Sequence, residues 1–449
     1  MVRLRPGSEI LMWEVPLMDK KKRFQDIAEF IGNTLNADDY VIKYENENEA
    51  LTRFADNKVT QNVDTLKETV SLTAWIDGKK ATLSSADCSR EGLKELTGKC
   101  EKAARASVPD KEYLPSLSDD GQVIEQMVDP AVLKAGAPER AAIAARTIAR
   151  ASQNKVTAFG TVFHTLNATG LATANGLLKY YENTAAGYSN TVDKNGEKGS
   201  SFSNGYDLAS MNPEEDFSRA LKDAELLQNR KEFDPGRYPV LLSAQAASKL
   251  MMWLGFFGAD RQAVDEGYSP YSNKMGETLV DTRISIGTNP AHPSSPSLPF
   301  DSAGLAVEDR KIIDKGVLTD IPCSRFWASQ KGYEPWSATN VVISDGTKTE
   351  EELLSSLDRG FYIKDLWYIR MVRMEDFTLT GMTRNGFFYV EDGKIVTGAT
   401  HFRWNDSPLR MLNNILGLGK GSGFVDSWFS VFTPSLLIRD FYLSSKTLF

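Results

Sequence analysis

The stretch that decides the fold is VIKYENENEALTRFADNKVTQN at residues 41–62, which leads into ETVSLTAWIDGKKATLSS at residues 68–85. Apolar and polar residues alternate in both segments, and this alternation is typical of strands with one buried face. The pairs Asp56-Asn57 and Asp77-Gly78 interrupt the alternation with residues that favour tight hairpin turns. The two segments therefore predict antiparallel β-hairpins.

Helical patterns lie on both sides of these strands. Apolar residues at three- and four-residue spacing predict helices over residues 23–35, 89–107, 137–152 and 213–229. Strands return after Val156, where Asn175-Gly176 predicts a further hairpin turn. The first half of the chain is therefore predicted to mix helices with antiparallel strands.

The segment FDPGRYP at residues 233–239 combines proline and glycine, which mark breaks between elements. We therefore predict an N-terminal extension over residues 1–21, an N-terminal α+β domain over residues 22–232 and a C-terminal β-rich domain over residues 233–449. The predicted fold class is α+β, with antiparallel hairpins and a few helices in the C-terminal domain.

Within the second half, the loop GTNPAHPSSPSLP at residues 287–299 carries four prolines, which favour an extended path over the surface. The segment TKTEEELLSSLDRG at residues 347–360 predicts one helix. Its capping box uses Thr347 with Glu350 or Thr349 with Glu352, and Gly360 is predicted to end it.

The composition restricts the class of protein. The 449 residues carry a formal net charge of −8, and the basic residues are interspersed with acids, so nothing indicates a nucleic-acid partner. The apolar run near Met251 is about half the ~20 residues that a bilayer requires. The three cysteines form no CxxC pair, which fits a reducing compartment. We therefore expect a cytoplasmic protein that does not bind membranes.

The chemistry of an active site is hard to find in this sequence. His164, His292 and His401 lie far apart, and no two histidines have the spacing of metal ligands on a helix. The glycine-rich segment GLGKGSG at residues 417–423 lacks the Ser or Thr of a phosphate-binding loop, so it predicts a flexible turn. No G-x-S-x-G motif supports a serine nucleophile, although a Ser/His/Asp triad stays open because its members are seldom neighbours. We therefore assign no catalytic and no metal-binding residue.

The segment KLMMWLGFFG at residues 249–258 is apolar on almost every side. A helix with this composition is typical of a protein core, so the sequence predicts a buried helix here.

Several segments, in this order and spacing, resemble the TldD/TldE (PmbA) family of metallopeptidase-related proteins. The segment most similar to a family signature is PFDSAGLAVEDRKIIDKGVLTDI at residues 299–321, with the signature turn carried by Phe300, Asp301, Gly304 and Gly316. Other similar segments are RYPVLLSAQAASKL (237–250), SPYSNKMGETLVD (269–281), the hairpin series over 361–396, EALTRFADNKVTQN (49–62) and LATANGLLKYYENT (171–184). The resemblance covers roughly residues 22–445.

The resemblance implies two kinds of member. TldD members carry an HExxxH helix with two zinc-binding histidines and a glutamate base, whereas TldE members lack this motif and pair with TldD. Counting back from Gly276-Glu277 places the motif at Met252, Trp253, Leu254, Gly255, Phe256 and Phe257. We call residues 252–257 the motif slot. None of the six can act as a zinc-binding histidine or as a glutamate base.

The resemblance therefore implies a TldE-like, non-catalytic subunit. We expect it to pair with a TldD-like zinc peptidase subunit that acts on unfolded peptides, with zinc only in that partner. Two alternatives stay open: a stand-alone homodimeric peptide-binding or scaffold protein, and an enzyme that uses scattered residues or an unusual metal site.

Overall fold

The computed structural model describes residues 19–425 and 430–447. Residues 1–18 of the predicted N-terminal extension lie outside the described residues, and helix α1 already begins at Lys20, inside the range given to that extension. Within the described residues, no helix combines the length and the apolar character needed to cross a bilayer.

The first half of the chain forms one antiparallel sheet with the strand order β3-β2-β1-β4-β5-β6. Its strands are β1 (Asp39–Ala55), β2 (Lys58–Ile76), β3 (Lys79–Ser85), β4 (Thr157–Thr173), β5 (Leu178–Lys194) and β6 (Glu197–Gly205). Asp56, Asn57 and Asp77 have positive φ angles of 50°, 58° and 51° at the ends of the first two hairpins. The hairpins predicted from the alternation are confirmed.

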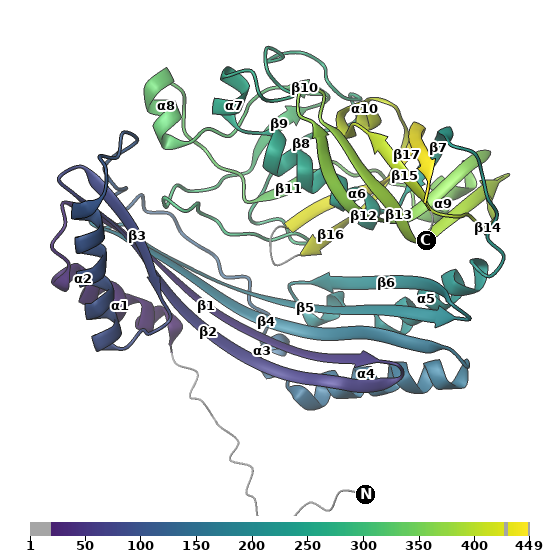
Figure 1. The fold of residues 1–449 in the computed structure, drawn as a ribbon, viewed down its shortest axis with the longest axis horizontal. Coiled ribbons are helices and arrows are strands. Elements are labelled where there is room, and N and C mark those ends of the chain that lie inside the picture. The colour runs from purple at the N-terminus through teal and green to yellow at the C-terminus, as the bar shows by residue number, and fades with distance from the viewer. Residues whose placement is uncertain (1–18, 426–429, 448–449) are drawn as a thin grey trace, which may run out of the picture.

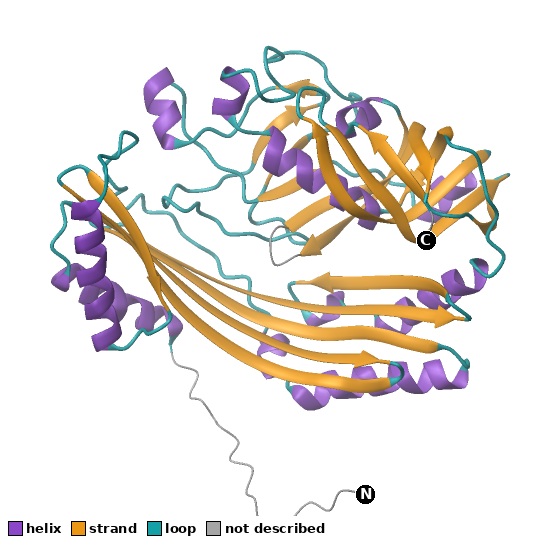
Figure 2. Cartoon of the chain, viewed as in Figure 1, coloured by secondary structure: helices purple, strands orange, loops and turns teal. Residues whose placement is uncertain are grey.

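Helices cover one face of this sheet (Figures 1 and 2). They are α1 (Lys20–Thr34), α2 (Arg90–Ala106), α3 (Pro130–Lys134), α4 (Ala137–Gln153) and α5 (Pro213–Leu226), with a short 3₁₀ turn η1 (Leu208–Ser210) before α5. Helices α1 and α2 bury Ile42 and Tyr44 at one end of β1, and α4 and α5 bury Phe54 at the other. Because side chains alternate along a strand, these three residues share one face, and Glu45, Glu47 and Glu49 lie on the opposite face.

The second half of the chain forms an eleven-stranded sheet. Its strands are β7 (Gly236–Leu242), β8 (Ile286–Thr288), β9 (Arg310–Asp314), β10 (Val317–Leu318), β11 (Asn340–Ile343), β12 (Arg359–Arg373), β13 (Thr378–Glu391), β14 (Lys394–Gly398), β15 (Phe402–Asp406), β16 (Ile415–Val425) and β17 (Ser430–Lys446). Its helices are α6 (Ala244–Trp253), α7 (Arg261–Asp265), α8 (Arg325–Lys331), α9 (Glu350–Ser355) and α10 (Pro408–Asn413), and a π turn, η2 (Leu254–Gly258), follows α6.

Most pairings in this sheet are antiparallel, but β7 with β12 and β11 with β17 are parallel, which the hairpin pattern did not predict. Two parallel neighbours are joined by a long connection and not by a tight turn, so no local turn signal in the sequence indicates that they pair. The chain has the predicted α+β fold. The domain boundary at residues 232/233 stays a prediction.

The glycine-rich segment 417–423 is wrongly predicted as a flexible turn, because it lies within strand β16. Each alternate glycine faces a close neighbour. A Cβ atom at Gly419 would lie 2.1 Å from Ser435 Oγ, at Gly421 2.2 Å from Phe432 Cζ, and at Gly423 1.5 Å from the Ser294 carbonyl oxygen. The glycines therefore allow close packing of a strand and do not make a turn.

Two further predictions in the second half need correction. The capping box at Thr349 and Glu352 is confirmed, but α9 ends at Ser355 and Gly360 lies in β12. The proline-rich loop is at the surface at Ala291, Pro293 and Ser294, as predicted, but its backbone is not extended. It folds back through backbone hydrogen bonds, and Asn340 Nδ2 binds the carbonyl oxygen of the fully buried Ser295 at 2.6 Å.

The signature turn connects the two halves. Phe300 is fully buried against Leu171, Leu177 and Tyr181 on the helix-free side of the first sheet. Gly304 has a φ of +89°, and a Cβ atom there would lie 2.2 Å from Leu177 Cδ2. The turn therefore requires glycine both for its backbone conformation and for its fit against the sheet.

The side chain of Asp301 holds the same turn together. Its Oδ1 accepts hydrogen bonds from the backbone N–H groups of Ala303 and Leu305, each at 2.9 Å, and its Oδ2 accepts one from Ser337 Oγ at 2.7 Å. Gly316, with a φ of +84°, makes the tight turn between β9 and β10. All four signature residues thus have structural partners.

We predict that Gly304→Ala lowers the free energy of unfolding by about 2–4 kcal/mol, because backbone strain adds to overpacking against Leu177. Gly332→Ala is the matched control: its φ is +74°, but nothing lies within 4 Å of the added Cβ. The control should lose only about 1–2 kcal/mol. Urea titration of both variants measures the difference, and equal losses would contradict the packing argument.

Candidate functional site

The motif slot lies where helix α6 changes into the π turn. Ser243 caps the start of α6, its Oγ accepting a hydrogen bond from the Ala246 N–H at 3.0 Å. Leu250, Met251 and Leu254 face the core of the second half. Met252 and Trp253 are partly buried against the same core, whereas Phe257 is 50% exposed. The side chain of Phe256 is outside the described residues.

The predicted buried helix is therefore wrong for its last turn. Helical hydrogen bonding widens at Leu254–Gly258, a segment that contains Gly255 and Gly258, and glycine is a poor helix former. The rings of Trp253 and Phe257 stack with centroids 4.8 Å apart. An apolar aromatic surface thus occupies the end of the slot and is half open to solvent.

The spacing of the π turn matters for the motif. In HExxxH the two histidines stand five residues apart, and a π turn pairs residue i with residue i+5. The backbone here therefore brings side chains that are five residues apart in sequence to the same side of the helix. The slot residues themselves do not fit zinc, because they offer no imidazole, thiolate or carboxylate.

Ionisable groups near the slot are already paired. Lys249, one turn before the slot, forms an ion pair with Asp365 and donates a hydrogen bond to the Leu366 carbonyl oxygen at 3.0 Å. Burial raises the pKa of the Asp365 carboxyl group. Across the described ranges, no three His, Cys, Asp or Glu side chains come together as a group that could hold a metal ion.

The three histidines lie in different parts of the molecule. His164 is in β4, His292 in the proline-rich loop and His401 just before β15. Their neighbours are Arg140 Nη1 for His164 (3.1 Å), the Phe432 ring for His292 (4.3 Å) and Thr383 Oγ1 for His401 (3.1 Å). Burial is the main cause that lowers the pKa of each histidine. Each ring therefore has its own structural contact.

The cysteines have the properties of structural thiols. All three are buried and free. Burial raises the pKa of Cys88 to about 12 and that of Cys323 to about 11, and it also raises the pKa of Cys100. A thiol with a raised pKa is a weak nucleophile at neutral pH.

A cavity of about 420 Å³ with a mixed polar and apolar lining lies between the two halves, and the sequence did not predict it. In its wall, Lys364 of β12 forms an ion pair with Asp223 of α5, and Tyr362 donates a hydrogen bond to Glu350. Burial raises the pKa of both carboxyl groups. The only sequence signal was an acid on the inward face of a predicted amphipathic helix, since Asp223 faces inward from α5.

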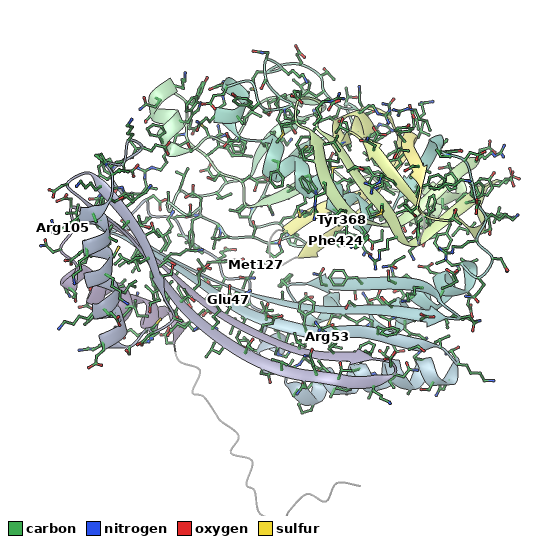
Figure 3. All side chains as sticks on the ribbon, in the orientation of Figure 1. Glu47, Arg53, Arg105, Met127, Tyr368 and Phe424 are labelled. Atoms are coloured by element: carbon green, nitrogen blue, oxygen red, sulfur yellow. The ribbon has the colours of Figure 1, made fainter. Side chains whose placement is uncertain are left out.

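Exposed aromatic residues on β12 also escaped the sequence analysis. Trp367 is 42% exposed and Tyr368 is 51% exposed, with a φ of +55° that is rare for a bulky residue. The guanidinium groups of Arg384 and Arg370 lie 4.2 and 4.3 Å from the centres of these two rings. Figure 3 shows Tyr368 on the side of the second half that faces the first sheet. The break in alternation at LWYI was the available signal.

We predict that His401 makes the folded protein less stable as the pH is lowered. Burial and the charges of Arg230 and Arg384 lower the pKa of its ring from 6.5 to about 4, so the unfolded chain binds a proton that the folded chain does not bind. Above pH 6.5 His401 costs the folded state nothing. As the pH falls from 6.5 towards 4, the free energy of unfolding decreases by about 3 kcal/mol because of this residue. Urea titrations of wild type and His401→Gln at pH 4.5 and 7.5 test this, and equal pH dependence would contradict it.

Comparison with known proteins supports the assignment of the second half. Residues 235–445 match the family described as the PmbA/TldA metallopeptidase C-terminal domain. A protein described as a metalloprotease from Methanothermobacter thermautotrophicus is 20% identical over an alignment of 206 residues that covers 42% of this chain. The alignment spans 45% of that relative, so the chain matches less than half of its length.

Solved structures share the fold over almost the whole chain. TldE from Thermococcus kodakarensis superposes with a TM-score of 0.85 at 15% identity, covering 94% of this chain and 100% of its own. A Thermotoga maritima protein described as a candidate modulator of a DNA gyrase superposes with a TM-score of 0.78 at 22% identity, covering 93% of this chain and 99% of its own. A Bacteroides thetaiotaomicron protein with a similar description superposes with a TM-score of 0.81 at 16% identity, covering 95% of this chain and 99% of its own. The domain match shows that residues 235–445 belong to the family of PmbA/TldA metallopeptidase C-terminal domains, and the whole chain shares its fold with these solved structures.

Proposed function

We propose that this chain is a TldE-like, non-catalytic subunit that pairs with a TldD-like chain carrying HExxxH and zinc. The observation that carries the proposal is the motif slot: its six residues supply no zinc ligand and no base. The similarity of the whole fold to TldE from Thermococcus kodakarensis supports it.

The proposed substrates of the pair are unfolded peptides. In the described part of the chain no helix of the first half covers the face of the first sheet that carries Glu47 and Glu49 (Figure 1), and both side chains are exposed. The exposed rings of Trp367 and Tyr368 offer apolar contacts on the other half. Extended peptides can contact such surfaces through their side chains, in a way that tolerates many sequences, and they bind through backbone hydrogen bonds where a strand edge is free.

A second candidate function is a stand-alone homodimeric binding or scaffold protein. It is favoured by the outer edge of β2, which pairs with β3 only over Val70–Ile76. Before Val70 this edge has no other strand beside it among the described residues, and Val59, Val63 and Leu66 are 48%, 37% and 62% exposed. An exposed edge of this kind can pair with a second chain.

Co-purification from the native host at endogenous levels tests the partner role. We expect mass spectrometry to find a chain that contains HExxxH at equal stoichiometry, with zinc in the complex. Recovery of self-dimers without such a chain would overturn the proposal and favour the homodimeric alternative.

We further predict that Met252→His combined with Phe257→His does not create a zinc site. The π turn favours the spacing, but a third ligand is missing, and two imidazoles alone leave the tetrahedral zinc shell open. Zinc content after dialysis, measured on the purified double variant and on wild type, should be equally low. Stoichiometric, tightly held zinc in the double variant would show that the site is only two ligands short.

A further inference from the structure

A second cavity, of about 340 Å³, lies where the β5–β6 hairpin of the first half meets strand β13 of the second. Side chains from both halves line it, among them Lys198, Arg230, Trp367, Thr383, Arg384 and His401. A volume of this size is at the lower end of the range for small-molecule sites, so it suits a ligand the size of an amino acid or a dipeptide.

Positive charge dominates the lining. Lys198, Arg230 and Arg384 are cationic, whereas Glu197 is the one acid among the lining residues. Glu197 is already bound, because it accepts a hydrogen bond from Arg230 Nε at 3.0 Å. Asp193 lies near the edge, 3.8 Å from Lys198 Nζ. The cavity therefore retains an excess of positive charge.

Arg384 is the cation best placed to receive a ligand. Its guanidinium lies over the Trp367 ring, 4.2 Å from the ring centre, which fixes the plane of the group. Over the described ranges its guanidinium forms no salt bridge and donates no hydrogen bond to a protein acceptor. Asp365, the carboxylate that interacts with it electrostatically, is itself paired with Lys249. A planar guanidinium with free donors matches the two oxygens of a carboxylate.

The base of the cavity is polar and neutral. Thr383 Oγ1 lies 3.1 Å from His401 Nδ1 and accepts a hydrogen bond from the Phe402 N–H at 3.1 Å. After burial, the charges of Arg230 and Arg384 are what lower the pKa of His401. A field that opposes a proton on this ring favours an anion in the same place.

The cavity also has an apolar side, formed by Trp367 and Leu227. We propose that this cavity binds a small carboxylate ligand, of amino-acid or dipeptide size, whose carboxylate pairs with Arg384 and whose apolar part packs on Trp367. This goes beyond the proposed function, because the site lies within one chain and needs no partner subunit.

Calorimetric titration of the full chain tests the proposal, with N-acetylphenylalanine as the probe and N-acetylphenylalaninamide as its neutral counterpart. We expect the acid to bind and the amide to bind at least about tenfold more weakly, since one charge-assisted pair is worth about 1.5 kcal/mol or more. Equal affinities, or no binding of the acid at millimolar concentration, would overturn the proposal. Tighter binding of inorganic phosphate than of the acid would overturn the carboxylate assignment.

Variants locate the site. Arg384→Gln should weaken binding of the acid at least about tenfold. Lys198→Gln, on the other half, should weaken it less but measurably. Arg359→Gln is the matched control, because Arg359 is an exposed arginine of the neighbouring strand β12 that binds Tyr389 outside the cavity. Binding that is unchanged in Arg384→Gln and Lys198→Gln would place the probe elsewhere.

The three histidines supply an independent readout. In NMR spectra of histidine-labelled protein, the His401 signal is assigned by its loss in His401→Gln. Bound carboxylate should raise the pKa of His401 by about one unit, because it offsets the charges of Arg230 and Arg384. The signals of His164 and His292 should not move. An unchanged His401 at saturating probe would contradict binding in this cavity.

Discussion

The contact between the signature turn and the first sheet is the constraint on which the rest of the molecule depends. Phe300 packs against Leu171, Leu177 and Tyr181. Leu177 lies so close to Gly304 that no side chain would fit at that position. This contact fixes one end of the second half on the first sheet. At the other end, the ion pair of Lys364 with Asp223 joins β12 to α5. Two cavities lie between the halves that these contacts join.

The sequence allowed much of the fold to be predicted, because the signals were local. Alternation along residues 41–62 and the turn pairs at Asp56-Asn57 and Asp77-Gly78 depend only on neighbours in the chain, and the hairpins follow from them. The glycines of β16 could not be interpreted in this way. The side chains of Ser435 and Phe432 on the paired strand fill the space where side chains at Gly419 and Gly421 would lie. A single sequence does not reveal which strand will be the neighbour.

The candidate site was predictable only in its position along the chain. The spacing from Gly276-Glu277 located the motif slot, yet apolar composition suggested a buried helix, and the structure has a π turn with Phe257 half exposed. Composition reports how apolar a segment is, whereas its exposure depends on what packs against it. The cavity around Arg384 and His401 was missed for a related reason: its residues come from β6, β13 and the segment before β15, which are far apart in sequence.

The free edge of β2 has a consequence for how the chain is handled before it assembles. Between Lys58 and Thr69 the outer backbone groups of β2 face no strand in the described part of the chain, and the charged residues Lys58, Asp64 and Lys67 interrupt its apolar positions. Such interruptions discourage uncontrolled stacking of strands while leaving the edge able to accept a matching one. Copies of the chain made in excess over a matching strand would therefore keep this edge exposed, and the charged positions would limit how far such copies stack on one another.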